Sequence, residues 1–209
     1  MDHTLKIGVL ALQGAFSEHI NILRRLGITA VEVRLPADLE GLDGLIIPGG
    51  ESTTIGKLAV MYGLMEPLGE FARQKPVWGT CAGMIFMAKD IGGSANGRAQ
   101  PLLGVMNISV ERNAFGRQID SFETGLDIAV FANGDAHPFP AVFIRAPKLV
   151  AAHGQAHVIA RLADGTAVAA QEGSWLVTSF HPELTDDSRF HQYFLQLVEK
   201  SKQTGPAGE

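Results

Sequence analysis

The stretch PVWGTCAGMIFM, residues 76–87, passes from an apolar run that favours a strand to a run that favours a helix, and the change falls at Cys81. Gly79 and Gly83 flank this cysteine in the spacing Gly-x-nucleophile-x-Gly, which is typical of a sharp strand-to-helix turn that exposes a reactive side chain. Such a turn brings backbone against backbone, so small residues on both sides are a steric requirement. The stretch therefore predicts an α/β fold in which Cys81 follows the end of a strand.

The sequence before this stretch alternates between strand and helix in the same way. Apolar runs without clean alternation are expected for strands that are covered on both faces, and they lie at residues 5–12, 28–35 and 43–50. Helical sequence lies between these runs and the cysteine stretch, at residues 16–27 and 53–74. A β-α-β order implies parallel strands, so we expect a parallel sheet of about four strands by the cysteine.

The pattern changes after a helix expected over residues 82–91. From about residue 102 to 180 the chain has short β-rich runs separated by Gly, Asp-Gly and Pro turns, which favours an antiparallel section. A C-terminal helix is expected over residues 185–200, with Thr185 as its N-cap. We expect one domain over residues 1–200 and a polar tail over 201–209. The β-rich runs lie at residues 104–112, 125–131, 141–147, 157–162, 166–171 and 175–180.

Composition restricts the class of function. The chain has 209 residues, 46% hydrophobic and 19% charged, and a formal net charge of −5, which argues against a broad surface for nucleic acid or an anionic membrane. One cysteine cannot form an internal disulfide, and the N-terminal sequence has no basic leader, so a reduced, cytoplasmic protein is expected. The seven histidines show no HxxxH or HExxH spacing, so no metal site is expected.

Two residues near the end of the chain could activate the thiol. In TSFHPEL, residues 178–184, an apolar strand ends at His181, and Glu183 stands two positions later, on the same side of an extended backbone. Pro182 favours that extended backbone at His181. A carboxylate on one imidazole nitrogen leaves the other free to take the thiol proton, so Cys81, His181 and Glu183 together predict an acyl-transfer triad.

Each part of this triad also has a structural interpretation. A lone cysteine is most often a small buried hydrophobic residue, and His181 with its neighbours could simply precede the last helix. The whole chain could also be a flavodoxin-like regulatory module whose cysteine is a redox sensor. What favours the triad is that ligand sites in open α/β sheets lie at the carboxyl ends of the strands, where both residues are expected.

These motifs together resemble a known family. PGGEST, GTCAG and FHPE resemble the class I glutamine amidotransferases, and the wider set LALQGAFSEH, PGGESTT, GTCAGMI, VERNAFGRQIDSFE, FIRAP and FHPELTDD is similar to the glutaminase subunits of pyridoxal 5'-phosphate synthase. The resemblance runs from about residue 5 to 198. It implies a flavodoxin-like amidotransferase fold, which is a mixed, mostly parallel sheet flanked by helices with an antiparallel section.

The resemblance also implies a reaction, the hydrolysis of L-glutamine to L-glutamate and ammonia. Cys81 would be the nucleophile, His181 the general base and then acid, and Glu183 the residue that orients the histidine. The substrate-binding positions that match the family are Gly49, Gly50, Glu51, Arg112, Ile144 and Arg145. The backbone N–H groups of Gly50 and Ala82 would bind the oxyanion.

A partner is implied in the same way. It would be the synthase subunit, a separate barrel enzyme that combines the ammonia with a pentose phosphate and a triose phosphate to make pyridoxal 5'-phosphate. In this family the glutaminase is poorly active until it docks on that subunit, and many copies of each assemble. Gln13, Glu18 and His19 match the docking segment. Pyridoxal phosphate would thus be the product of the complex, and no cofactor is expected on this chain.

Other hydrolases keep the same thiol turn and distant histidine. A γ-glutamyl hydrolase, or a glutaminase attached to the synthetase of another pathway, would show both features. The short chain argues against a fused synthetase.

Overall fold

The parallel part of the sheet holds the strands expected from the sequence. The computed structural model of the chain describes residues 4–92, 100–112, 121–131 and 137–204. Strands β1 and β2 are parallel and are joined by α1 (Phe16–Arg25), which confirms the β-α-β unit. Across the sheet the parallel strands run in the order β2 (Thr29–Val33), β1 (Lys6–Leu10), β3 (Gly44–Ile47), β4 (Val77–Thr80) and β12 (Trp175–Thr178).

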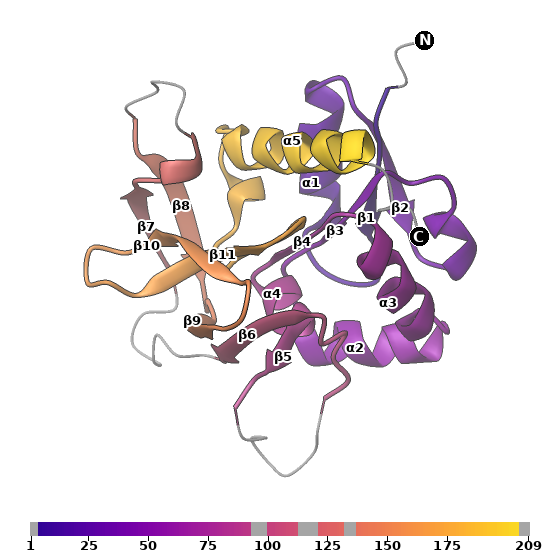
Figure 1. Cartoon of the computed structure of the whole chain (residues 1–209), viewed down its shortest axis with the longest axis horizontal. Helices are drawn as coiled ribbons and strands as arrows, with labels where there is room; N and C mark the ends of the chain where they lie inside the picture. The colour runs from indigo at the N-terminus through magenta and orange to yellow at the C-terminus, as the bar shows by residue number, and fades with distance from the viewer. Residues whose placement is uncertain (1–3, 93–99, 113–120, 132–136, 205–209) are drawn as a thin grey trace.

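Helices cover both faces of this parallel part. α1 and α5 (Arg189–Thr204) lie on one face, while α2 (Ser52–Met61), α3 (Met65–Gln74) and α4 (Ala82–Met87) lie on the other (Figure 1). Successive residues of a strand point to opposite faces of the sheet and join different hydrophobic clusters. Val77 packs with residues of α2, α3 and α4, and Trp78 packs with residues of α1 and α5. This explains why the strand sequences are apolar without alternation.

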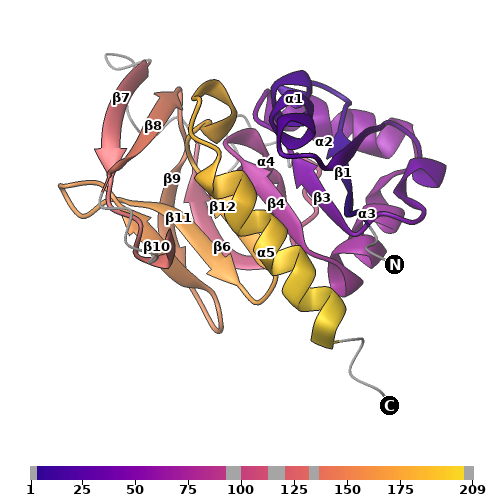
Figure 2. The same ribbon diagram turned by 90° about the horizontal axis from the view of Figure 1, so that it is seen from above.

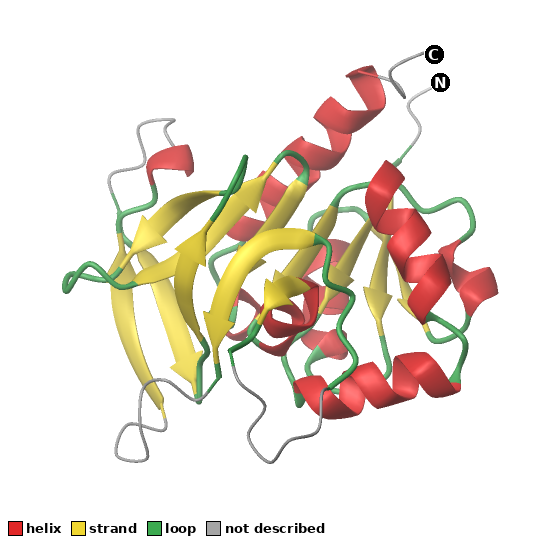
Figure 3. Cartoon of the chain, turned by 60° about the horizontal axis from the view of Figure 1, so that its bottom comes forward, coloured by secondary structure: helices red, strands yellow, loops and turns green. Residues whose placement is uncertain are grey.

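An antiparallel section extends the sheet beyond β12, as the turn-rich sequence predicts. β11 (Ala167–Glu172) runs antiparallel to β12, and β9 (Lys148–Ala152), β6 (Met106–Glu111) and β5 (Ala88–Asp90) follow. β10 (His157–Arg161) also pairs with β11, and β7 (Ser121–Leu126) pairs with β8 (Phe139–Ile144) in a separate ribbon. Figures 2 and 3 show these strands gathered on one side of the molecule and most helices on the other.

Several element boundaries differ from the sequence prediction. The helix expected over 82–91 ends at Met87, because Ala88 takes an extended conformation and pairs with Met106 as the start of β5. The expected strand over 125–131 is also wrong, since β7 ends at Leu126 and Ala129–Phe131 form a short 3-10 helix, η2. The helical sequence over 53–74 is two helices, α2 and α3.

The start of the C-terminal helix was also predicted wrongly. The residues after His181 form a short 3-10 helix, η3 (Pro182–Leu184), and Thr185 ends it with extended backbone. α5 begins only at Arg189, whose N–H donates to the Asp187 carboxylate at 3.0 Å, and it runs to Thr204. Among the described residues, no helix is both long enough and apolar enough to span a membrane.

Candidate active site

Four neighbouring strands deliver their carboxyl ends to one edge of the sheet. β1, β3, β4 and β12 are adjacent and parallel, so the segments that follow them emerge side by side. These segments carry Gln13, Gly49, Cys81 and His181 respectively. Cys81 and His181 are a hundred positions apart along the chain, but they follow two strands that pair directly. Thr178 of β12 lies opposite Thr80 of β4, so the two residues come close in space.

Cys81 occupies a strained turn between β4 and α4. Its φ is 47° and its ψ is −102°, a conformation that a side chain other than glycine rarely adopts and that costs about 1–3 kcal/mol. The predicted steric need for glycine is confirmed, because a Cβ on Gly83 would lie 2.1 Å from the carbonyl oxygen of Ile47 and one on Gly79 would lie 2.6 Å from the backbone of Gly83. The Cys81 N–H donates to the Thr178 carbonyl at 2.8 Å, which ties the turn to β12.

His181 lies between the thiol and a carboxylate. Its Nδ1 is 2.6 Å from Glu183 Oε1, and its ring lies beside Cys81, with both residues against Gly49 and in the lining of one pocket. Since Nδ1 is engaged by the carboxylate, Nε2 is the nitrogen that is left for the sulfur. His181 is 8% exposed and Glu183 5%, so the array is shielded from water.

The surroundings of His181 favour its charged form. Burial by itself lowers the pKa of this histidine, but the neighbouring Cys81 and Glu183 side chains favour the charged ring, outweigh burial and raise the pKa to about 10. At neutral pH the ring is therefore an imidazolium held between two acidic partners. Such a ring can deliver a proton to a leaving group.

Most of the predicted substrate positions line one pocket above the thiol. Its volume is about 360 Å³, and it is open on one side. Gly49 does not line the pocket but adjoins it: a Cβ on Gly49 would meet the His181 ring at 2.3 Å and Cys81 Cβ at 3.3 Å, so the turn runs directly against both residues. The pocket is lined by Gln13, Gly50, Glu51, Ser52, Cys81, Ala82, Ile85, Arg112, Ile144, Arg145 and His181.

Glu51 serves as the N-cap of α2. Its carboxylate accepts hydrogen bonds from the backbone N–H groups of Thr53, at 3.0 Å, and Thr54, at 2.7 Å. Burial raises the pKa of Glu51, but these bonds and the one from the Thr54 hydroxyl outweigh it and lower the pKa to about 2. The charged carboxylate thus caps the helix at the pocket, and it also faces Arg112, with Arg112 Nη2 and Glu51 Oε1 3.7 Å apart.

Residues before α1 hold the glycine turn after β3. The Gln13 side-chain oxygen accepts from the Glu51 N–H at 2.6 Å, and the Ala15 N–H donates to the Gly49 carbonyl at 3.1 Å. Because a trans peptide is planar, the N–H of Gly50 points away from Ala15. The segment predicted to dock a partner therefore sets the orientation of a predicted oxyanion donor.

Gln100 is a site residue that the sequence did not reveal. Its side-chain oxygen accepts from Ser52 Oγ at 3.3 Å, Thr53 Oγ1 at 3.1 Å and Arg112 Nη1 at 2.7 Å, so it fixes the arginine against α2. No motif or periodicity surrounds this glutamine. Residues 113–120, which carry most of the quoted VERNAFGRQIDSFE motif, lie outside the described residues.

Arg145 has a second unusual backbone conformation at this site. Its φ is 43°, and among the described residues only Cys81 and Arg145 combine a positive φ with a side chain. Both line the pocket. Strained backbone is retained where the surrounding structure fixes it, often at functional positions.

The three predicted docking residues differ in exposure. Gln13 and Glu18 are partly exposed, whereas His19 is completely buried beneath the active site. The His19 side chain therefore offers no surface to a partner in this structure. Its ring instead lies in a polar cluster with Glu183, Thr80 and His191.

The two buried histidines of this cluster are held neutral. Burial lowers the pKa of His191 to about 3, with a smaller contribution from the charge of Arg25. Burial also lowers the pKa of His19 well below its usual value, and the neighbouring His191 and His181 lower it further. Both rings therefore keep a single proton across the neutral and mildly acidic range.

The neutral histidines predict acid lability. An unfolded histidine binds its proton near pH 6.5, whereas folded His191 resists protonation down to about pH 3. The stability it contributes is complete above pH 6.5 and is lost as the pH falls, so this residue alone should remove about 2 kcal/mol of unfolding free energy between pH 7 and pH 5. We expect His191→Phe to lose less stability over this interval in denaturant titrations.

The control for this prediction is His157→Phe, which changes an exposed histidine on β10. It should leave the pH dependence of the unfolding free energy as in the parent chain. Identical pH dependence in His191→Phe and the parent would contradict the assignment.

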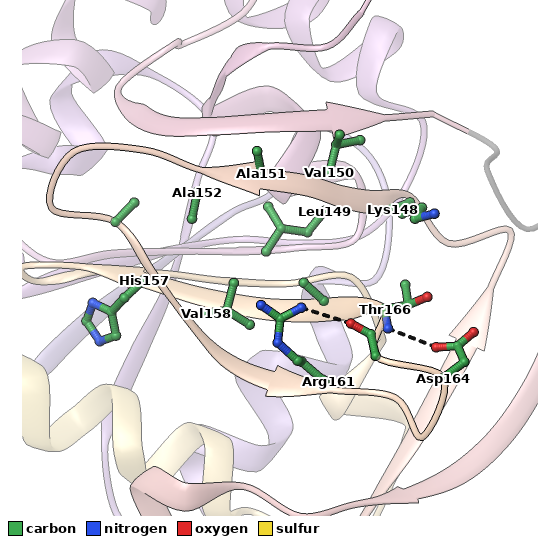
Figure 4. Close-up of a pocket in the computed structure, with 13 residues that line it drawn as sticks. Lys148, Leu149, Val150, Ala151, Ala152, His157, Val158, Arg161, Asp164 and Thr166 are labelled. Carbon is green, nitrogen blue, oxygen red and sulfur yellow. Dashed lines mark hydrogen bonds between the residues drawn. The ribbon is translucent and has the colours of Figure 1, made fainter.

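A second, larger hollow lies in the antiparallel section. It has a volume of about 660 Å³ and opens where β9 and β10 separate, with Lys148, His157, Arg161 and Asp164 around it (Figure 4). Arg161 donates to the Gly165 carbonyl and Asp164 accepts from the Thr166 N–H, so these side chains are engaged with their own turn. None of the residues that line it is a nucleophile with a base beside it, so the smaller pocket is the candidate active site.

Comparisons with known proteins identify relatives of this chain. A family model described as the SNO glutamine amidotransferase family matches residues 9–200. A protein of Dehalococcoides mccartyi named pyridoxal 5'-phosphate synthase subunit PdxT is 58% identical over 200 residues, which are 95% of this chain and 100% of that protein. A protein of the same name from Herpetosiphon aurantiacus is 55% identical over 196 residues, which are 92% of this chain and 100% of that protein.

A solved structure has the same fold. It is described as a glutamine amidotransferase, is 49% identical and superimposes with a TM-score of 0.84 over 92% of this chain and 98% of that chain. The predicted fold class, a mostly parallel sheet flanked by helices with an antiparallel section, is confirmed.

Proposed function

The chain belongs to the SNO glutamine amidotransferase family, and from this premise we propose how its residues carry out the reaction. The protein is a glutaminase that releases ammonia from L-glutamine and feeds it to pyridoxal 5'-phosphate synthesis. The observation that supports the proposed mechanism is the position of His181, which lies beside Cys81 in the pocket and has its Nδ1 2.6 Å from Glu183 Oε1.

The first half-reaction forms a thioester. At neutral pH His181 already holds the proton of the Cys81 thiol as an imidazolium, and the deprotonated sulfur attacks the side-chain carbonyl carbon of glutamine. The N–H of Ala82, at the free first turn of α4, and the N–H of Gly50 bind the negative oxygen of the tetrahedral intermediate. The imidazolium then gives its proton to the leaving nitrogen, the carbon–nitrogen bond breaks, and ammonia departs.

The second half-reaction restores the thiol. Neutral His181 takes a proton from water, and the resulting hydroxide attacks the thioester carbonyl while the same two N–H groups bind the oxyanion. The carbon–sulfur bond then breaks, glutamate leaves, and the proton held by His181 is again shared with the freed sulfur. Glu183 keeps the ring in the orientation that both proton transfers require.

Substrate recognition follows from the charges at the pocket mouth. The α-carboxylate of glutamine suits the guanidinium groups of Arg112 and Arg145, and Gln100 holds Arg112 in place. Glu51 offers a carboxylate near the same opening, which suits the substrate ammonium. Gly49, Gly50 and Ile144 would complete the contacts with the glutamine side chain.

Replacing Glu183 with glutamine should move the alkaline limit of activity. The amide still accepts a hydrogen bond from His181 Nδ1, but the negative charge that helps to raise the pKa of His181 to about 10 is lost. The pKa then falls toward its ordinary value of about 6.5, and the imidazolium is lost at lower pH. We expect the alkaline limb of kcat for ammonia release to shift to lower pH.

Glu66→Gln, an exposed change on α3, is the matched control and should leave the pH profile unchanged. An unshifted alkaline limb in Glu183→Gln would contradict the role given to Glu183.

The partner in this proposal is the synthase subunit of pyridoxal 5'-phosphate synthase. Two relatives bear the name of that enzyme's subunit PdxT. Docking would involve Gln13, just before α1, and Glu18 in its first turn. His19 would take part only indirectly, because it lies on the same helix but its side chain is buried. Because residues 13–15 hold the Gly49–Gly50 turn by two hydrogen bonds, a partner that shifts this segment would also orient the oxyanion donor.

Paired glutaminase assays test this coupling. Ammonia release should rise when the synthase subunit is added, by up to about 10²- to 10³-fold if one oxyanion donor is set by docking. Gln13→Ala should reduce the increase, whereas Glu66→Ala should not. Equal rates with and without the synthase subunit would contradict the coupling.

Three further features belong to the same proposal. Residues 1–200 form one glutaminase domain, and many copies of the chain assemble with many copies of the synthase subunit. The protein works in the cytoplasm, which suits a single catalytic cysteine that must stay reduced.

A further inference from the structure

We propose that His19 is a positioning residue that holds the free oxygen of the Glu183 carboxylate, so that this carboxylate lies between two imidazoles. The inference rests on the triad proposed above. It gives a role to a buried side chain on α1 that does not line the substrate pocket.

The two oxygens of Glu183 are used differently. Oε1 is 2.6 Å from His181 Nδ1. Oε2 is buried and, among the described residues, has no partner that meets hydrogen-bond geometry, but His19 Nε2 lies 3.4 Å away. A buried carboxylate oxygen without a donor is costly, so a small approach of the His19 ring that completes this bond is favoured.

The other contacts of His19 select the tautomer that can donate to Glu183. His19 Nδ1 is 2.9 Å from His191 Nε2, and both rings are neutral, so one of these nitrogens carries the shared proton. If His191 Nε2 donates, His19 carries its own proton on Nε2, facing the carboxylate. His191 Nδ1, which has no described partner, is then a bare lone pair.

The opposite tautomer is unfavourable at both ends of the cluster. If His19 Nδ1 donated, its Nε2 lone pair would face the Glu183 oxygen. His191 would then carry its proton on the buried Nδ1, and buried N–H groups without partners are rare. Thr80 Oγ1, 3.4 Å from His19 Nε2, is the other acceptor within reach of that proton.

Rigid surroundings make His19 suitable for this role. It has no exposed surface, its ring meets the edge of Trp78 at a centroid distance of 5.6 Å, and α1 packs against η3, which carries Glu183. The same helix is preceded by the residues that hold the Gly49–Gly50 turn. Loss of the His19 donor should therefore leave the pocket intact but loosen the carboxylate, which affects kcat rather than KM.

Two amide variants of similar chemistry test the inference, in the complex with the synthase subunit. The amide of His19→Gln reaches the place of Nε2 and can still donate to Glu183, whereas the amide of His19→Asn reaches only the place of Nδ1 and retains the contact with His191. We expect His19→Asn to lower kcat by about 10- to 100-fold at nearly unchanged KM, and His19→Gln to lower it much less. Equal losses, or the reverse order, would overturn the inference.

Leu23→Ala is the stability control, because Leu23 is fully buried on the same helix and does not line the site. It should lower the melting temperature and leave kcat as in the parent chain. A matching loss of kcat in Leu23→Ala would assign the effect of His19→Asn to the helix as a whole and overturn the inference.

A double-mutant cycle separates this inference from the triad. If His19 acts through Glu183, adding His19→Asn to Glu183→Gln should change kcat by less than about twofold. If His19→Asn lowers kcat as much in the Glu183→Gln variant as in the parent chain, the role of His19 is overturned, while the triad is not affected. Parent-like activity and pH profile in Glu183→Gln by itself would instead overturn the triad.

Discussion

Replacing Cys81 with alanine should abolish glutamine hydrolysis, with a loss of the order of 10⁶-fold in kcat. The sulfur is the atom that forms the thioester, and no other described side chain in the pocket is a thiol. The variant should fold, because alanine loses little volume and needs no hydrogen bond from the side chain. Ammonia release in the presence of the synthase subunit is the measurement.

Covalent labelling checks that Cys81 is the residue responsible. A thiol-alkylating glutamine analogue should modify the parent chain at Cys81 and leave Cys81→Ala unmodified, as read by mass spectrometry of the digested protein. Substantial ammonia release by Cys81→Ala would show that another group attacks the substrate.

Replacing His181 with asparagine should lower kcat by about 10²- to 10⁴-fold, the usual contribution of a positioned acid or base. Asparagine cannot carry the proton between sulfur and leaving nitrogen, whereas the pocket that binds glutamine keeps most of its lining. Glutamine should therefore still bind. The same variant separates the glutaminase from a redox sensor, whose thiol oxidation would not require this histidine.

His157→Asn is the matched control for this change. It is exposed on β10, in the hollow of the antiparallel section, and should retain parent activity. Near-normal turnover in His181→Asn with the partner present would leave Cys81 without its base and refute the triad.

The outline of the catalytic site could be predicted because it depends on strand ends. The Gly79–Gly83 spacing places Cys81 at a turn, and a strand that ends before His181 places the histidine at the same edge of the sheet. The Glu183 contact follows from a separation of two residues. Each of these signals is local, and the parallel sheet brings them together.

The buried polar cluster could not be predicted in this way. His19 and His191 are 172 positions apart and meet because α1 and α5 cover the same face of the sheet, which depends on how the helices pack. Each histidine looks like an ordinary polar position of an amphipathic helix. The docking role inferred for His19 from family resemblance shows the same limit, since the resemblance carries no measure of exposure.

Errors at element ends have a similar origin. Residues 88–91 continue a helix-favouring sequence, but Ala88 pairs with Met106, and Ala88–Asp90 form β5. Thr185 has the residue type of an N-cap, yet η3 places it before a further turn, and α5 starts only at Arg189. In both cases a tertiary contact overrides a local preference.

The central position of β12 has a consequence for synthesis of the protein on the ribosome. This strand is made after every other strand, yet it inserts between β4 and β11 in the middle of the sheet. A nascent chain that lacks it already contains Cys81 but has neither the Thr178 carbonyl that holds the cysteine turn nor a base beside the sulfur. Ammonia production would thus begin only when translation is almost finished, and chains interrupted earlier would consume no glutamine.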